Sequence, residues 1–219
     1  NINGVFPTTL EDRVRDKLRF AADWTPVENV SLQLMLEDGK DRFSAPSEQG
    51  LRDTNMRTVG VDLAWKISDK WRVTGWWNVG SQTLHINNVG YLAELANNTE
   101  SSGVGFVGNP SSQYELGATV SYLNDRNRYL PTQASGAAPL GGGLSDINYM
   151  LASLKLFGKY ALEKNADLRL DIMHQAANLG EWTWANNGTS FAYSDNSTVS
   201  MQPNQEVTFV GVSYIYKLK

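Results

Sequence analysis

The chain has 219 residues and a formal net charge of −4, with 19 Lys and Arg against 23 Asp and Glu. It lacks the basic footprint that phosphate binding needs, so nucleic acid is not expected as a partner. These residues include no cysteine, which excludes a disulfide framework, a zinc–cysteine site, a thiol nucleophile and a covalently attached c-type haem within them.

The apolar residues alternate with polar ones instead of forming long runs. No run approaches the roughly 18 residues of a transmembrane helix, and the mean hydropathy is −0.37. Val59, Val61, Leu63, Trp65 and Ile67 occupy every second position of one segment. Side chains of a β-strand point alternately to opposite faces, so this pattern predicts a strand with one apolar and one polar face.

In chain order, the alternation predicts about nine strands. They cover residues 13–24, 30–37, 55–67, 70–84, 113–123, 127–133, 146–162, 167–177 and 206–219. The sixth has the weakest pattern and contains Pro131, which cannot donate to a strand ladder.

The predicted connections alternate in length. Short polar turns are expected near residues 25–29, 68–69, 124–126 and 163–166, and long loops near residues 38–54, 85–112, 134–145 and 183–205. In outer-membrane barrels the short turns are periplasmic and the long loops extracellular. Residues 1–219 are therefore predicted to form one all-β domain, a transmembrane antiparallel β-barrel in the outer membrane of a Gram-negative bacterium.

Aromatic residues of the apolar parity support this fold class. The predicted girdle at one membrane interface consists of Trp24, Trp65, Trp71, Tyr122, Tyr160, Tyr214 and Tyr216. Tyr114, Trp182 and Trp184 suggest a second girdle at the other ends of their strands. Residues of this parity between the girdles are almost all aliphatic, as a lipid face requires. A soluble sandwich with an aromatic-rich core is the alternative, but it explains neither the turn-proximal aromatics nor the loop lengths.

The strand count bears on how the barrel closes. Bacterial single-chain barrels have even strand numbers, whereas about nine strands are predicted here. Either residues 2–6 form a tenth strand, or the chain is the carboxyl-terminal portion of a larger barrel.

The polar parity collects charged residues that would face the lumen. The candidates for contact with a partner are Arg13, Arg15, Lys17, Arg19, Arg72, Lys155, Lys159 and Arg169. One interpretation is a charged lining that packs against an enclosed protein, and the other is an ordinary hydrated lumen. The residues alone leave both open.

Catalysis is not predicted, and we assign no residue a catalytic or metal-binding role. The two histidines, His85 and His174, have no evident Ser and Asp partners for a catalytic triad. The acidic stretch 37–41 lacks the ligand spacing of an EF-hand loop. An outer-membrane lipase or acyltransferase would need a Ser–His pair that meets at one rim of the barrel.

Four segments resemble the MtrB/PioB family of outer-membrane proteins. They are LEDRVRDKLRFAADWTP at residues 10–26, LEDGKDRF at 36–43, GLRDT at 50–54 and VDLAWKISDKW at 61–71. Their order follows that of the family, and the resemblance is clearest over residues 10–84.

The resemblance implies a large barrel that acts as an insulating sheath around a periplasmic multihaem c-type cytochrome. An extracellular multihaem cytochrome would dock outside, while lipid and lipopolysaccharide would surround the barrel. The haem would belong to the partner, and the chain itself would bind no cofactor. A general diffusion porin or small solute channel is the alternative function, and the two differ in whether protein or water fills the lumen.

Overall fold

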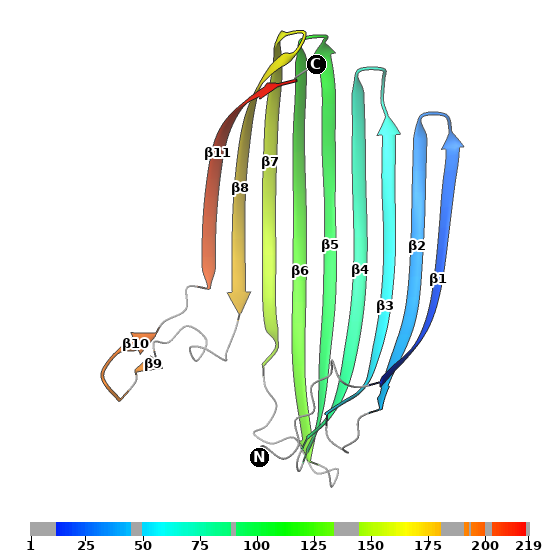
Figure 1. The fold of residues 1–219 in the computed structure, drawn as a ribbon, viewed down its shortest axis with the longest axis vertical. Coiled ribbons are helices and arrows are strands. Elements are labelled where there is room, and N and C mark those ends of the chain that lie inside the picture. Colours follow the sequence, from blue (N-terminus) through cyan, green and yellow to red (C-terminus); the bar gives the residue numbers. More distant parts are fainter. Residues whose placement is uncertain are drawn as a thin grey trace.

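The computed structural model describes residues 12–44, 50–88, 91–133, 145–180, 191–192, 194–199 and 203–217. Nine strands form one antiparallel sheet in the order β1-β2-β3-β4-β5-β6-β7-β8-β11 (Figure 1). These are β1 (Asp12–Val27), β2 (Val30–Ser44), β3 (Gly50–Lys66), β4 (Trp71–Asn88), β5 (Tyr91–Ser111), β6 (Tyr114–Gln133), β7 (Ile147–Glu163), β8 (Ala166–Gly180) and β11 (Asn204–Tyr216). A separate two-stranded sheet pairs β9 (Phe191–Ala192) with β10 (Thr198–Val199).

The predicted all-β antiparallel fold class is confirmed. Within the described ranges, no helix is long and apolar enough to span a membrane. One end of the sheet, here named the turn end, carries the connections at residues 28–29, 67–70, 112–113 and 164–165. The opposite end, here named the loop end, carries the connections at residues 45–49, 89–90, 134–146 and 181–203.

The long loop predicted over residues 85–112 is wrong. β4 continues to Asn88, and β5 begins at Tyr91. β5 is rich in Asn, Ser, Thr and Gly, which are typical of loops, but its backbone pairs with β4 on one side and β6 on the other. Cross-strand pairing outweighs residue propensity in such a segment. Residues 38–44 and 50–54 of the loop predicted over 38–54 likewise belong to β2 and β3.

The turn predicted at residues 124–126 is also wrong, because these residues lie inside β6. The strands predicted over residues 113–123 and 127–133 are therefore parts of one strand. Asp125 pairs with Thr99 in the ladder, and its carboxylate accepts a hydrogen bond from the Asn97 side chain. Turn-forming residue types are thus accommodated within a regular strand.

The cross-strand pairs bring apolar residues from each of the nine strands together on one face of the sheet, here named the band face. Val61, for example, pairs with Leu34 on β2 and with Trp77 on β4. The band includes Leu18, Phe20, Leu32, Leu34, Leu63, Val73, Val104, Phe106, Leu116, Val120, Leu154, Leu156, Leu170, Val210 and Val212. The apolar positions of the band face on β6, from Tyr114 to Tyr122, span about the 9–11 residues of a membrane-crossing strand.

The band crosses the strands obliquely. Followed through the cross-strand pairs, Trp24 on β1 lies level with Thr208 on β11. The aromatic residue nearest the turn end is Trp24 on β1 but Tyr216 on β11, eight residues beyond Thr208. A drift of one residue per strand corresponds to a tilt of about 35° at ~3.3 Å per residue and ~4.8 Å between strands. This tilt is that of strands in outer-membrane barrels.

The sheet is a single layer without a conventional core. Among the described residues, only Ala93 and Ala166 are buried apolar residues, each 3% exposed. Large apolar side chains of the band stay open, and the exposed fraction reaches 74% at Leu18 and 70% at Val212. In water such a surface would be unfavourable, whereas lipid accommodates it without a cost.

Glycines on the sheet make room for aromatic rings of the neighbouring strand. Gly117 on β6 pairs with Phe157 on β7, and a Cβ atom at Gly117 would lie 2.1 Å from that ring. Gly103 on β5 stands in the same relation to Trp76 on β4, at 2.2 Å. In each pair the aromatic ring packs over the glycine backbone, which has no side chain to cover it. This arrangement is common in β-sheets.

Candidate functional site

The face opposite the band, here named the inner face, carries the predicted partner-contact residues. Cross-strand pairing puts the eight cations on this one face: Arg13, Arg15, Lys17, Arg19, Arg72, Lys155, Lys159 and Arg169. The first four lie on β1 toward the loop end, and the other four lie on β4, β7 and β8 toward the turn end.

The cations of β1 are paired with carboxylates of β2. Arg15 donates two hydrogen bonds to Asp41, at 2.6 and 2.7 Å. Lys17 and Arg19 both bind Glu37, at 2.6 and 2.7 Å, and Arg13 reaches Asp41 at 4.0 Å. Asp41 is only 5% exposed, so its charge depends on the Arg15 contact for compensation. Two carboxylates of β2 therefore compensate half of the four positive charges predicted on β1.

Two of the turn-end cations are also paired. Lys159 forms an ion pair with Glu115. Arg169 binds Asp171 through two nitrogens, and its guanidinium lies 4.3 Å from the centre of the Phe157 ring. Planar arginine suits such a bidentate and stacked arrangement. These contacts fix the side chains along the wall.

Arg72 and Lys155 differ from the other six cations. Neither forms an ion pair with any residue in the described part of the chain. Arg72 lies between Lys66 and Val107 in the ladder, and Lys155 lies between Thr119 and Met173. The two are accordingly the inner-face cations whose charge the neighbouring strands leave uncompensated.

The predicted girdle residues lie on the band face, and all but one lie near the turn end. Tyr122 is the exception: it occupies the middle of β6 and pairs with Ser102 and Ala152. Its predicted place beside a short turn is wrong because β6 continues beyond residues 124–126. Tyr114, predicted for the second girdle, begins β6 at the turn end and contacts Tyr160, with ring centroids 4.9 Å apart. Trp182 and Trp184 lie outside the described residues.

Tyr122 and Trp77 together mark the loop-end limit of the band. Both flank Ser102 on β5 in the ladder. The indole N–H of Trp77 donates to Glu100 at 3.0 Å, which keeps its polar atom satisfied at an interface. Trp77 was not among the predicted girdle residues, although its parity within β4 is that of Trp71 and Val73.

Beyond this limit the band face becomes charged. On the band face, Arg57 binds Asp38 at 2.7 Å, Arg42 binds Asp16 at 2.8 Å, and Arg126 and Arg128 both bind Asp146. The hydrogen bond from Arg126 and the charges of both arginines lower the pKa of Asp146 below its ordinary value. Charged pairs of this kind are incompatible with the lipid core, so these segments lie outside it.

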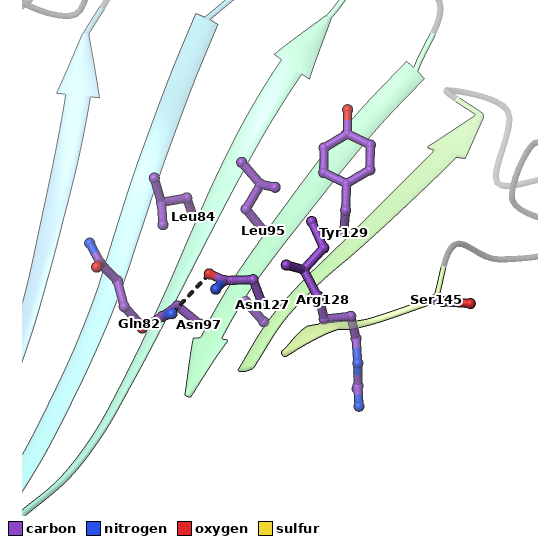
Figure 2. Close-up of a pocket in the computed structure, with 10 residues that line it drawn as sticks. Gln82, Leu84, Leu95, Asn97, Asn127, Arg128, Tyr129 and Ser145 are labelled. Atoms are coloured by element: carbon purple, nitrogen blue, oxygen red, sulfur yellow. Dashed lines mark hydrogen bonds between the residues drawn. The ribbon is translucent and has the colours of Figure 1, made fainter. Parts of the chain in front are cut away.

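The inner face carries apolar side chains on β4–β7 in the same loop-end region, whereas on β1 and β2 it stays charged through residues such as Arg15 and Asp41. A hollow of about 570 Å³ opens there, lined by Leu84, Leu95, Tyr129 and Ile147. Gln82, Asn97 and Asn127 line its other side, and Asn97 donates to Asn127 at 2.8 Å. Figure 2 shows Leu84, Leu95 and Tyr129 on one side of the sheet while Arg128 extends from the other. No predicted site residue belongs to this hollow.

The histidines do not form a catalytic arrangement with a serine. His85 lies 2.7 Å from Asp53 and 3.6 Å from Glu94, and His174 lies 2.9 Å from the Thr208 hydroxyl. Both lie on the band face. No group of three or more His, Cys, Asp or Glu side chains within the described ranges is arranged to hold a metal ion.

Comparison with known proteins identifies the family. Residues 3–218 match the family described as "Putative outer membrane beta-barrel porin, MtrB/PioB". The chain belongs to the MtrB/PioB family. The resemblance over residues 10–84 is thereby confirmed, and it extends to essentially the whole chain. The protein lies in the outer membrane of a Gram-negative bacterium.

Solved structures share the fold of this MtrB/PioB chain. The copper transporter OprC is 10% identical with a TM-score of 0.71, covering 95% of this chain and 35% of OprC. BauA, the ferric preacinetobactin receptor from Acinetobacter baumannii, is 13% identical with a TM-score of 0.62, covering 94% and 38%. The ferric citrate transporter FecA in the unliganded form is 12% identical with a TM-score of 0.55, covering 95% and 34%.

The chain thus spans about a third of the length of these three proteins. At such identities the likeness establishes the outer-membrane barrel fold alone. Among curated proteins, none matches the chain.

Proposed function

We propose that this chain forms part of the wall of an outer-membrane barrel that encloses a multihaem c-type cytochrome and supports electron transfer across the outer membrane. Membership of the MtrB/PioB family over residues 3–218 is the observation that carries the proposal. The haem belongs to the enclosed cytochrome, and the wall has a passive, non-enzymatic role. It excludes lipid and holds the cytochrome at a fixed depth.

In this assembly the band face meets lipid and lipopolysaccharide, and the inner face lines the lumen. The turn end is then periplasmic and the loop end extracellular. The extracellular multihaem cytochrome would dock at the loop end. The tilt of about 35° and the aromatic residues at both limits of the band support a membrane-spanning wall. The longer connections at the loop end support its extracellular placement.

The two free edges of the sheet require further strands. Among the described residues, β1 and β11 are its outermost strands, and both run from the loop end to the turn end. An antiparallel barrel cannot close by pairing two strands that run the same way. Open edges leave backbone groups unpaired, which the lipid core does not tolerate. An odd number of additional strands would complete the wall.

The inner-face charges support a protein-lined lumen. Six of the eight predicted contact cations are held by carboxylates of the same wall, as Arg15 is by Asp41. Fixed pairs present a structured surface on which a partner can pack. Arg72 and Lys155, which lack such pairs, are the cations that would meet acidic groups of the cytochrome, its haem propionates included.

A diffusion porin remains the second candidate, because the turn-end inner face is polar and charged enough to hold water. The full-length native protein purified in detergent distinguishes the two functions through its visible spectrum. A c-type Soret band in stoichiometric amount supports the sheath. A colourless, heat-modifiable barrel that conducts ions in a planar bilayer would contradict it and favour the porin.

A further inference from the structure

A polar hollow opens on the band face where the apolar band of β2, β3 and β4 ends toward the loop end. This outer hollow has a volume of about 350 Å³, and its outward-pointing lining residues are Asp38, Lys40, Asn55, Arg57, Ser81 and Thr83. They form two rows of ladder partners, Asp38–Arg57–Ser81 and Lys40–Asn55–Thr83. Ladder partners point to the same face of a sheet, so all six side chains lie on the side that meets the membrane.

The neighbouring apolar residues fix the depth of the outer hollow in the membrane. Leu36, Val59 and Val79 are ladder partners, and they end the band on β2, β3 and β4. The two rows of the hollow follow two and four positions later, about 7 and 13 Å along the strands at ~3.3 Å per residue. With the tilt of about 35°, the rows lie roughly 5 and 11 Å beyond the hydrocarbon core. The headgroup layer adds about 5–7 Å to each side of that core, so the outer hollow opens into it.

The charges around the outer hollow leave one cation without a partner. Lys40 is half-buried and forms no ion pair or side-chain hydrogen bond within the described part of the chain. The nearby carboxylates of this face have other partners: Arg57 binds Asp38 at 2.7 Å, Arg42 binds Asp16 at 2.8 Å, and His85 lies 2.7 Å from Asp53. The Lys40 ammonium is therefore available to a ligand that carries negative charge.

The other lining groups are donors of hydrogen bonds. The hydroxyls of Ser81 and Thr83 have no side-chain partner among the described residues. The guanidinium of Arg57 is well exposed, and a guanidinium has more N–H groups than its contact with Asp38 occupies. An ammonium, a guanidinium and two hydroxyls that converge on one hollow suit the oxygens of a phosphate group.

We propose that the outer hollow binds a phosphate group of lipopolysaccharide. Lipopolysaccharide forms the outer leaflet of the Gram-negative outer membrane, and its lipid A disaccharide carries phosphates in the headgroup layer. Lys40 supplies the charge that no carboxylate of the wall compensates, while Arg57, Ser81 and Thr83 orient the phosphate oxygens. The choice of this lipid rests on the orientation given with the proposed function, in which the loop end is extracellular.

Lipid A binding to the full-length protein, purified in detergent as it is isolated from the membrane, tests the site. Diphosphoryl lipid A is titrated, and the molecules bound per barrel are counted by native mass spectrometry. Lys40→Gln should weaken this binding severalfold. Lys164→Gln is the matched control, because it makes the same charge change in the exposed connection 164–165 at the turn end. Equal affinities of wild type and Lys40→Gln would overturn the site.

Asp38→Asn tests the site in the opposite direction. The change removes the negative charge beside the proposed phosphate and releases Arg57, so lipid A should bind severalfold more tightly. A pair with a merely structural role would leave lipid A binding unchanged, and that result would contradict the site. Heat-modifiable migration confirms that each variant has assembled.

Probes that carry phosphate differently identify the occupant. Lipid A without phosphates should bind wild type as weakly as diphosphoryl lipid A binds Lys40→Gln. Displacement of lipid A by millimolar inorganic phosphate, or equally tight binding of phosphatidylglycerol, would overturn lipopolysaccharide as the occupant. The haem content of the same samples tests the proposed function separately. A colourless barrel that binds lipid A through Lys40 would support this site and reject the sheath.

Discussion

On β6 and β7, the turn-end and loop-end halves of the sheet carry opposite kinds of residue on each face. On β6, the band-face positions from Tyr114 to Tyr122 are apolar, and those from Asn124 to Arg128 are polar. On β7, the inner face carries Lys155 and Lys159 in the turn-end half and Ile147 in the loop-end half. The side-chain alternation continues without a break, so only the surroundings change. The residue types of a strand therefore follow its surroundings: its band face meets lipid in the turn-end half and water in the loop-end half.

The largest effect is expected from a charge in the band of the turn-end half. Leu154→Arg should impair assembly, because an arginine on the lipid face is unfavourable, by roughly 2–4 kcal/mol at the bilayer middle and by less toward the interfaces. Leu154 lies between Val120 and His174 in the ladder and is 38% exposed. The measurement is the heat-modifiable fraction, followed by urea unfolding of the folded protein in lipid vesicles.

Asn98→Arg is the matched control for the band, because Asn98 lies on the same face in the loop-end half. Its assembly should match that of wild type. If both arginine variants assemble and unfold like wild type, the band face does not meet lipid. The two halves would then not differ in environment.

The second prediction concerns the buried carboxylate of the loop-end half. Asp41→Ala removes the partner of Arg15 and should destabilise the barrel by about 1–3 kcal/mol, since a charged donor loses its acceptor. Asp38→Ala is the control, because Asp38 and its partner Arg57 are both well exposed, and such pairs contribute little. Equal losses of unfolding free energy in the two variants would mean that the burial of Asp41 does not strengthen its contact with Arg15.

The change of the band face from apolar to polar explains which parts of the fold the sequence predicts. The strands predicted over residues 30–37 and 113–123 end where the band face becomes polar, at Asp38 and Asn124. Alternation of apolar with polar residues is the signal for a strand, and it disappears when both parities carry polar groups. The turn-end halves of the strands other than β5 were therefore predicted. β5, with polar residues over most of its length, was missed entirely.

The candidate site on the inner face could be predicted from the sequence only in part. Parity alone assigns Arg15 and Lys155 to one face, because the side-chain period of a strand is two. Their partners depend on register between strands, which sequence alternation does not fix. The contrast between paired Arg15 and unpaired Lys155 therefore required the structure. Leu84 and Ile147 were missed because they were predicted to lie at a strand end, not on an open inner surface.

The third prediction compares two lysines on the inner face of β7. Lys155→Glu should weaken retention of the cytochrome without changing barrel stability, because Lys155 has no carboxylate partner among the described residues. Lys159→Glu should chiefly destabilise the wall, since it would place two carboxylates together at Glu115. Haem per assembled barrel and the urea midpoint separate these effects. The same loss of haem in both variants, with equal midpoints, would remove the distinction between paired and unpaired cations.

The smallest effect is expected at the loop end, from the ion pairs of Asp146 with Arg126 and Arg128. The arginines lower the pKa of Asp146, so the pair stabilises the folded state above the ordinary Asp pKa of about 4. That contribution is lost as the pH falls through the lowered pKa, because the protonated carboxyl no longer attracts the arginines. Asp146→Asn should therefore be less stable than wild type at neutral pH, by less than about 1 kcal/mol. The difference should disappear in strong acid, as measured by urea unfolding at both pH values. A difference that stays constant with pH would assign the effect to packing at the start of β7. The ion pairs on the band face of the loop-end half would then add nothing to the stability of the fold.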